Sequence, residues 1–218
     1  SLDPDIADKM LTLIEQLKID NFLKDKKIID GYEDGSFKPL NQINRAEALK
    51  IILGAIVRSP KKTEIVTEPT TQETAPKTFS DVPANAWFAT FIQQALENEI
   101  ISGYPDGTFH PEQSINKVEA LKMVLLQAGN QLPTEIKDQP YSDVPTDAWF
   151  AKYAQVSKER GLYLEDRKAG ALNPDQLLNR GQFAELIYHL MQSNSGYRFG
   201  RATYYSDILA GRGTASGD

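Results

Sequence analysis

The sequence predicts a mainly α-helical protein assembled from three helix–turn–helix modules with short extended arms, because one passage recurs three times along its 218 residues. The clearest copy covers residues 79–129 and reads FSDVPANAWF, then GYPDGTFHP, then INKVEALKMVLLQAG. A second copy covers residues 141–192. An incomplete copy, with IIDGYEDGSFKP and INRAEALKIIL, covers about 19–57.

The spacing of the repeated residues supports this interpretation independently of their similarity. Phe79 lies eight residues before Trp87, and Tyr141 lies eight residues before Trp149. In every copy an asparagine follows a proline by five residues and opens NRAE, NKVE or NRGQ (Pro39 and Asn44, Pro111 and Asn116, Pro174 and Asn179). Because one module of this size cannot bury enough apolar surface alone, the three are expected to fold as one compact unit.

The first module, residues 1–57, is predicted to begin with an N-terminal helix. Asp3 and Pro4 suit the N-cap and first position of a helix, and apolar residues follow at helical spacing (Ile6, Met10, Leu13, Ile14, Leu17). GYEDG at 31–35 predicts a tight turn. Asn44 and Glu47 predict a capping box at the start of a second helix, whose buried face consists of Ala48, Leu49, Ile51, Ile52 and Ile56.

Residues 58–78 are predicted to be an extended linker, since they hold three prolines and many threonines without an amphipathic period. A glycosylated or partner-binding tether is the alternative. The second module, residues 79–130, is interpreted as an FSDV entry, a helix from about Trp87, a turn at 103–107, an arm and a helix capped by Asn116. The third module, residues 141–193, repeats this order with a divergent turn, LYLEDRKAGALNP.

The tail, residues 194–218, contains Tyr205-Ser206-Asp207-Ile208, which is similar to the FSDV and YSDV openings of the second and third modules. The first module has no such opening of its own. Two interpretations stay open at this stage. Either the tail folds back into the position that FSDV takes in the other modules and closes a three-fold ring, or it starts a further repeat.

The composition excludes several classes of protein. A chain that is 40% hydrophobic and 25% charged is typical of a soluble globular protein, and a net charge of −6 argues against a nucleic-acid partner. No apolar run approaches the ~20 residues that cross a bilayer. Disulfides and thiolate chemistry are excluded because there is no cysteine. The start at SLDPD, without a basic and apolar leader, indicates either a protein that is not exported or a mature segment.

No catalytic, cofactor or metal site is predicted. The Asp-Gly pairs at 34–35 and 106–107 lack the pattern of a calcium loop, and His110 and His189 lie in different modules. The sequence shows no Ser–His–Asp or Cys–His grouping, no paired-carboxylate pattern and no Gly-rich phosphate loop. The chain is therefore not expected to be an enzyme.

The order FSDV, Trp, GYPDGTF, an arm ending in proline and INRAE at a helix start resembles the S-layer homology domain, over about residues 19–192. The resemblance implies three tandem modules in a pseudo-three-fold prism around a central three-helix bundle, within a monomer. It also implies an extracellular protein of the bacterial cell surface that is anchored non-covalently to the cell wall. The implied partner is a cell-wall polysaccharide with pyruvate ketals, held in grooves between modules.

The resemblance further implies which residues bind that glycan. They are the basic residues Arg45, Lys117 and Arg180, the tryptophans Trp87 and Trp149, the aspartates Asp81 and Asp143, and the turn glycines Gly31 and Gly103. Asp207 joins them if the tail closes the ring. The first module has Glu15 or nothing at the Trp position, and the third has Leu162-Tyr163 at the glycine and Gln182 in place of Glu. One or two working grooves are therefore expected.

The chemistry of these residue types suits an anionic sugar. Arg pairs bidentately with a carboxylate, Lys offers a point charge, and Trp supplies a flat apolar face for a pyranose. A basic residue in the first turn of a helix opposes the helix dipole, so helix stability does not explain its place there. Backbone N–H groups of the same turn favour an anion.

Each assignment has a structural alternative. Trp87 and Trp149 begin apolar helices, which by itself favours a place in the core. Asp81 and Asp143 are interpreted first as caps of the following turn, and Arg45 as either a ligand-binding residue or a solvated or ion-paired surface residue. The alternative for the whole chain is a structural or protein-interaction module that keeps the fold but has lost sugar affinity.

Overall fold

The computed structural model describes residues 4–25, 29, 32, 34–56, 78–163, 166 and 169–194, with side chains of the first helix described at Ile14 and from Gln16 onward. Within these ranges the protein is mainly helical, as predicted, and its only β-structure is isolated bridges. The helices are α1 (Pro4–Asp25), α2 (Arg45–Ala55), α3 (Ala89–Glu97), α4 (Lys117–Gln127), α5 (Ala151–Arg160) and α7 (Arg180–Asn194).

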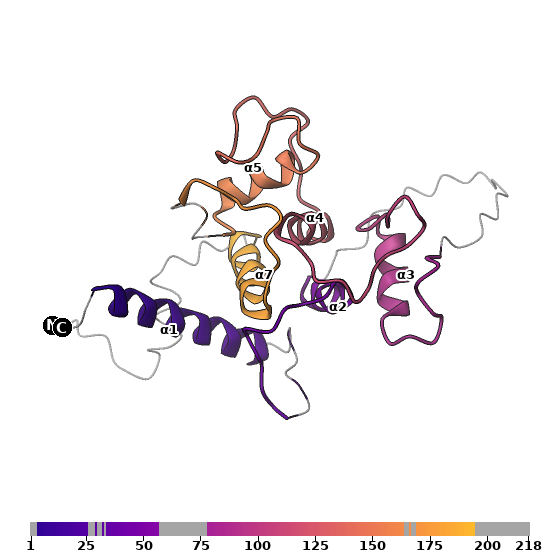
Figure 1. The fold of residues 1–218 in the computed structure, drawn as a ribbon, viewed down its shortest axis with the longest axis horizontal. Coiled ribbons are helices and arrows are strands. Elements are labelled where there is room, and N and C mark those ends of the chain that lie inside the picture. Colours follow the sequence, from indigo (N-terminus) through magenta and orange to yellow (C-terminus); the bar gives the residue numbers. More distant parts are fainter. Residues whose placement is uncertain are drawn as a thin grey trace, which may run out of the picture.

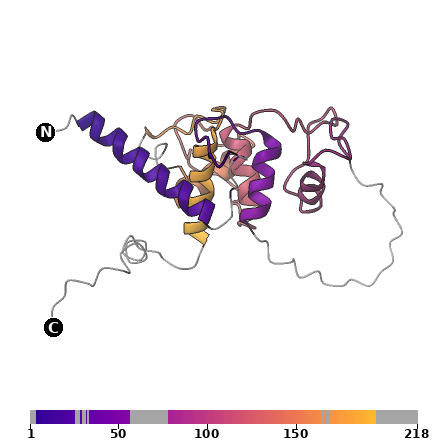
Figure 2. The same cartoon turned by 90° about the horizontal axis from the view of Figure 1, so that it is seen from below.

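Three helices, α2, α4 and α7, lie at the centre, and each is the second helix of one module (Figure 1). The first helix of each module packs against the second helix of the module before it: α3 against α2, and α5 against α4. The helix α1 packs against α7, so the first and last described helices meet (Figure 2). The modules are therefore interlocked in a cycle, which explains how three units of this size share one core.

A closed cycle of hydrogen bonds joins the three arms at the pseudo-three-fold axis. Ile43 donates its N–H to Leu178 O at 3.2 Å, Leu178 donates to Ile115 O at 3.0 Å, and Ile115 donates to Ile43 O at 3.1 Å. The three side chains are fully buried. Backbone bridges pair neighbouring arms at the same points (Gln42 with Asn179, Asn44 with Ser114, Asn116 with Leu177). This cycle gives the predicted three-fold arrangement its centre.

Each central helix begins with a capping box made within its own module. The Asn44 side chain accepts the Glu47 N–H at 2.8 Å, and the Glu47 carboxylate accepts the Asn44 N–H at 3.3 Å. Asn116 and Glu119 repeat this exchange. At α7 the Gln182 amide oxygen accepts the Asn179 N–H at 3.1 Å, so the change from Glu to Gln leaves the box intact.

The predicted turns are confirmed where the structure describes them. Gly35 and Gly107 have φ of 75° and 82°, which favours glycine. The Asp34 and Asp106 carboxylates accept hydrogen bonds from the backbone and hydroxyl groups of the residue two positions on, Ser36 and Thr108. Those bonds lower the pKa of Asp34 to about 2.

Several predicted boundaries differ in the structure. The helix α1 runs without interruption through Phe22 and Leu23 to Asp25. The first helices of the second and third modules begin at Ala89 and Ala151, two residues after the tryptophans. Asp3, Gly31, Val57, residues 58–77 of the predicted linker and the tail from 195 onward lie outside the described residues.

Replacing Glu99 with glycine is expected to stabilise the protein. Glu99, two residues after the end of α3, lies in the left-handed region at φ 58°, whereas the equivalent residue after α5 is Gly161 at φ 64°. Because a side chain is disfavoured in that region, Glu99→Gly should raise the free energy of unfolding by about 0.5–1 kcal/mol. Chemical denaturation measures this. Glu99→Ala is the control, since it removes the side chain but keeps the Cβ, and an equal gain there would refute the backbone explanation.

Candidate functional site

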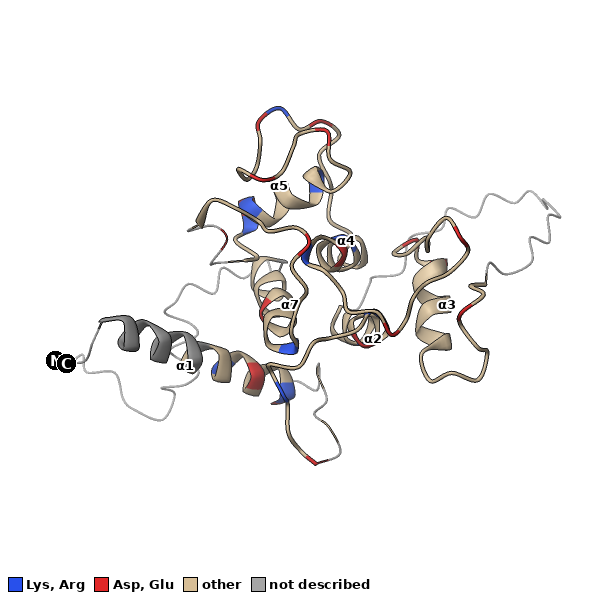
Figure 3. Cartoon of the chain, viewed as in Figure 1, with Lys and Arg blue, Asp and Glu red and all other residues tan. Residues whose placement is uncertain are grey.

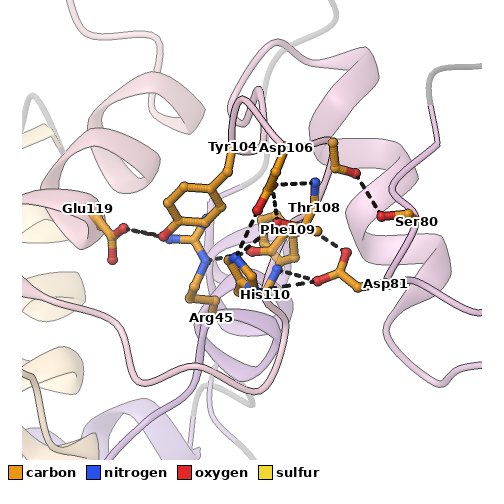
Figure 4. Close-up of polar contacts among 10 residues, drawn as sticks. Arg45, Ser80, Asp81, Tyr104, Asp106, Thr108, Phe109, His110 and Glu119 are labelled. Carbon is orange, nitrogen blue, oxygen red and sulfur yellow. Dashed lines mark hydrogen bonds and ion pairs between the residues drawn. The ribbon is translucent and has the colours of Figure 1, made fainter.

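The basic residue that opens α2 is buried at the boundary between the first two modules (Figure 4). Arg45 is 5% exposed. Its Nε donates to Phe109 O at 2.9 Å, and its guanidinium lies 2.9 Å from the Glu119 carboxylate. The guanidinium carbon lies 5.0 Å from the ring centre of Tyr104 and 4.7 Å from that of Phe109. The interpretation of Arg45 as a solvated surface residue is therefore wrong, and its ion-pair partner Glu119 is only partly exposed.

Lys117 and Arg180 take the same place at the other two boundaries and are 4% and 6% exposed. The Lys117 ammonium lies 2.9 Å from both carboxylate oxygens of Asp166. The Arg180 Nε donates to Phe37 O at 3.1 Å, and its guanidinium covers the ring of Tyr32 at 4.8 Å. Each basic residue thus reaches from one module into the next. These contacts explain why a cation opens each helix despite the dipole.

The first-turn N–H groups of the central helices are already used, so the expectation that they favour an anion is wrong. Arg45 donates its N–H to Gln113 O at 2.9 Å and Ala46 donates to Pro111 O at 3.0 Å, both in the arm of the next module. The third N–H of the turn, that of Glu47, donates to the side chain of the N-cap residue Asn44. The same pattern recurs at α4 and α7 (Lys117 to Gln176, Val118 to Pro174, Arg180 to Asn41, Gly181 to Pro39).

Asp81 and Asp143 cap backbone at a distance in the sequence. The two oxygens of Asp81 accept the N–H groups of Phe109 and His110 at 2.8 and 2.7 Å (Figure 4). Asp143 does the same with Leu172 and Asn173, at 2.8 and 2.7 Å. The prediction of a capping role was right in kind, but the capped groups lie in the arm and not in the turn that follows each Asp. We call this arrangement the aspartate clamp.

Gly103 has a structural reason to be glycine. Its φ is 71°, and a Cβ there would lie 2.1 Å from Cε1 of Phe79, the residue that opens the same module. Phe79 in turn packs on Phe109, with ring centres 5.6 Å apart. Gly31, the counterpart of Gly103 in the first module, lies outside the described residues.

Trp87 and Trp149 are 53% and 55% exposed, so the alternative that each belongs to the core is wrong. Both precede their helices and lie edge-on to the following phenylalanine, with ring centres 5.4 Å apart. Large exposed aromatic rings of this kind are available to a ligand.

A cavity of about 180 Å³ brings together predicted site residues from all three modules. Of the predicted site residues, Arg45 comes from the first module, Gly103 from the second and Trp149 from the third; Tyr104 of the second module, which was not predicted, lines the cavity too. Glu119, Lys122 and Met123 of α4 complete the lining with 100–102. We call this cavity the Arg45 groove. Asp81 and Asp143 do not line it.

Lys122 is a basic residue of this groove that the sequence did not identify as a site residue. It is half-buried, its ammonium lies 5.7 Å from the ring centre of Trp149, and no salt-bridge partner is found for it among the described residues. Burial first, and then the positive charges of Arg45 and Lys152, lower the pKa of Lys122. The available signal was the shared EALK of the first two modules, which places Lys50 at the same position and Glu185 in the third.

A family model described as the S-layer homology domain matches residues 21–49, 78–121 and 140–184, which together make up more than half of the chain. The chain belongs to the S-layer homology domain family. The matched segments coincide with the three modules of the fold, and the cavity lies where those modules meet.

Curated relatives of this S-layer homology domain are much longer proteins. A cellulosome-anchoring protein of Acetivibrio thermocellus is 29% identical over 73% of this chain and 34% of its own length. A surface-layer 125 kDa protein of Lysinibacillus sphaericus is 29% identical over 78% of this chain and 14% of its own length. The S-layer protein EA1 of Bacillus anthracis is 29% identical over 62% of this chain and 15% of its own length. The chain thus spans at most about a third of these relatives.

Three other findings concern the described part of this S-layer homology domain. No described helix has the length and apolarity to cross a bilayer. Among the described residues, no three His, Cys, Asp or Glu side chains are grouped so that they could hold a metal ion. Basic and acidic residues are interspersed along the described elements (Figure 3).

Gly103→Ala is expected to destabilise this domain far more than Gly107→Ala. Both glycines have positive φ, but only at Gly103 would the Cβ clash with Phe79; at Gly107 nothing lies within 4 Å. We expect a loss of about 3 kcal/mol for Gly103→Ala and about 1 kcal/mol for Gly107→Ala in urea denaturation. Equal losses would show that Gly103 serves only its backbone conformation.

Proposed function

We propose that this chain is the envelope-binding part of a larger surface protein. In this proposal it acts as a non-catalytic monomer at the bacterial cell surface and binds a cell-wall polysaccharide that carries pyruvate ketals. The observation that carries the proposal is the Arg45 groove, where a half-buried lysine with a lowered pKa lies beside an exposed tryptophan.

Lys122 supplies the charge that attracts the ketal carboxylate. Burial and two neighbouring cations disfavour its charged form, and an incoming carboxylate would offset both effects. Arg45 adds positive potential, but Glu119 already pairs with it, so its main task is to hold Tyr104 in the wall of the groove and to pack on the buried Phe109. The sugar ring would then lie against Trp149.

Internal symmetry supports a second groove of the same chemistry. The residues equivalent to Arg45, Tyr104, Glu119, Lys122 and Trp149 are Arg180, Tyr32, Glu47, Lys50 and Trp87. Arg180 covers Tyr32 as Arg45 covers Tyr104, and α3 packs on α2 as α5 packs on α4. We call this set the Arg180 groove and propose that it also binds the glycan.

The residues around Lys117 differ from those of the Arg45 and Arg180 grooves at each position that would attract or contact an anionic sugar. Asp166 supplies a bidentate internal carboxylate to the buried Lys117, with both distances at 2.9 Å. Glu185 replaces the lysine that lines the Arg45 groove, and no tryptophan occupies the corresponding place in the first module. We propose that this groove does not bind glycan and that its ion pair serves stability.

Removing the exposed tryptophans tests the two-groove proposal. Titration calorimetry with a single pyruvylated repeating unit avoids avidity, and we expect two sites per chain. Trp149→Ala should weaken its groove about 30-fold, typical for loss of a central aromatic contact, and leave one measurable site. Trp87→Ala should remove the site in the Arg180 groove and leave the site in the Arg45 groove. The double variant should have no measurable site.

Controls separate binding from folding. Lys122→Met should repeat the loss at the Arg45 groove, whereas Lys152→Met, on the neighbouring helix, should not. The same sugar without its ketal should not bind. A folded wild-type chain that binds neither form would contradict the proposal and favour the protein-interaction module instead.

The ion pair at the third boundary gives a separate prediction. Asp166→Asn should cost about 3–5 kcal/mol in the free energy of unfolding, since it leaves Lys117 buried without its carboxylate. The double variant Lys117→Met, Asp166→Leu should recover most of that loss. In calorimetry this double variant should keep both glycan sites, and loss of a site would show that the Lys117 groove binds.

A further inference from the structure

We propose that the tail segment Tyr205-Ser206-Asp207-Ile208 docks on the arm of the first module of its own chain, where it forms a third aspartate clamp. This inference is independent of glycan binding. The tail lies outside the described residues; its docking surface, the two clamps that are described and the length of the connection support the docking.

The two described clamps share one set of contacts. Ser80 donates its N–H to Gly107 O at 3.1 Å, and Ser142 donates to Gly170 O at 2.9 Å. The following aspartate accepts two N–H groups of the arm, and the second of those belongs to a residue with positive φ: His110 at 56° and Asn173 at 54°. The preceding aromatic residue, Phe79 or Tyr141, is buried.

The first module presents the same surface. Lys38 has a φ of 53°, equivalent to His110 and Asn173, although it is neither glycine nor asparagine. Gly35 is the equivalent of Gly107. Phe37 is only half-buried, whereas its equivalents Phe109 and Leu172 are fully buried beneath their clamps. Within the described part of the chain, no carboxylate accepts the N–H groups of Phe37 and Lys38.

The upstream segment of the first module forms part of α1, so it does not supply a clamp for its own arm. The residues that align with FSDV in the first module are 7–10, and they lie inside α1. The tail holds the one further aromatic-Ser-Asp-aliphatic sequence of the chain, at 205–208. Its chemistry matches the surface: an aromatic ring for Phe37, a serine for Gly35 and a carboxylate for two N–H groups.

The connection is long enough for this docking within one chain. The helix α7 starts beside the arm, since Gly181 donates its N–H to Pro39 O at 2.9 Å. Its 15 residues end about 21 Å away. The ten residues 195–204 span up to about 33 Å when extended, so they can return along the helix.

Docking of the tail on this arm would stabilise the boundary between the third and first modules, where Arg180 lies. The same arm supplies Phe37 O to the Arg180 side chain, and Pro39 O and Asn41 O to the start of α7. A third clamp would therefore hold the arm that caps α7, as Asp81 holds the arm that caps α2.

Amide hydrogen exchange of the full chain tests the proposal. We expect the N–H groups of Phe37 and Lys38 to be protected, and Asp207→Ala to make them exchange at least tenfold faster. Phe109 and His110 should be unaffected by Asp207→Ala and respond only to Asp81→Ala, which makes them the internal control. Because Asp207 lies beyond α7, its variant should stay folded.

Two results would overturn the proposal. One is equal exchange of Phe37 and Lys38 in the wild type and Asp207→Ala. The other is protection that falls on dilution together with a dimer in sedimentation, which would mean that a second copy supplies the tail. Protection that is independent of concentration in a monomer supports docking within one chain, whether or not the protein binds glycan.

Discussion

The structure depends on the hydrogen bonds by which the arm of one module caps the central helix of another. Arg45 and Ala46 donate to the second arm, and the equivalent residues of α4 and α7 donate to the third and first arms. A helix start that lacks such partners leaves N–H groups unsatisfied, which is costly in a buried position. No module can therefore complete its own helix, and the three are expected to fold together.

Burial of the three basic residues follows from this geometry. Each cation opens a helix whose backbone is tied to the next module, so its side chain enters that module and covers an aromatic ring there. Their repetition in the sequence therefore has a structural cause. In the proposed function, ligand binding depends instead on what surrounds each cation: Lys122 and Trp149 at one boundary, Asp166 and Glu185 at another.

Much of the fold could be predicted from the sequence. The three modules, the turns and the capping boxes come from contacts within a few residues, and those leave a local pattern. The arrangement of the modules in space leaves no such local pattern. Arg180 meets Phe37 across 143 positions, and no local spacing indicates that partner.

The candidate site was predictable in part. Arg45, Gly103 and Trp149 were identified and do line one cavity, whereas the aspartates act in clamps. The tryptophans were predicted to bind glycan from the family resemblance, whereas a helix start at each of them favoured a place in the core. Since α3 and α5 begin two residues later, neither ring lies on the apolar face of its helix. Lys122 was missed because only a comparison between modules distinguishes it from other surface lysines.

A crystal structure with a short pyruvylated wall-polysaccharide fragment would test the central claim most directly. The account predicts ligand in the Arg45 and Arg180 grooves, with the ketal carboxylate facing Lys122 and Lys50 and the sugar against Trp149 and Trp87. It also predicts that the Lys117–Asp166 pair stays closed. Ligand bound at Lys117 with Asp166 displaced, or bound away from both tryptophans, would contradict it.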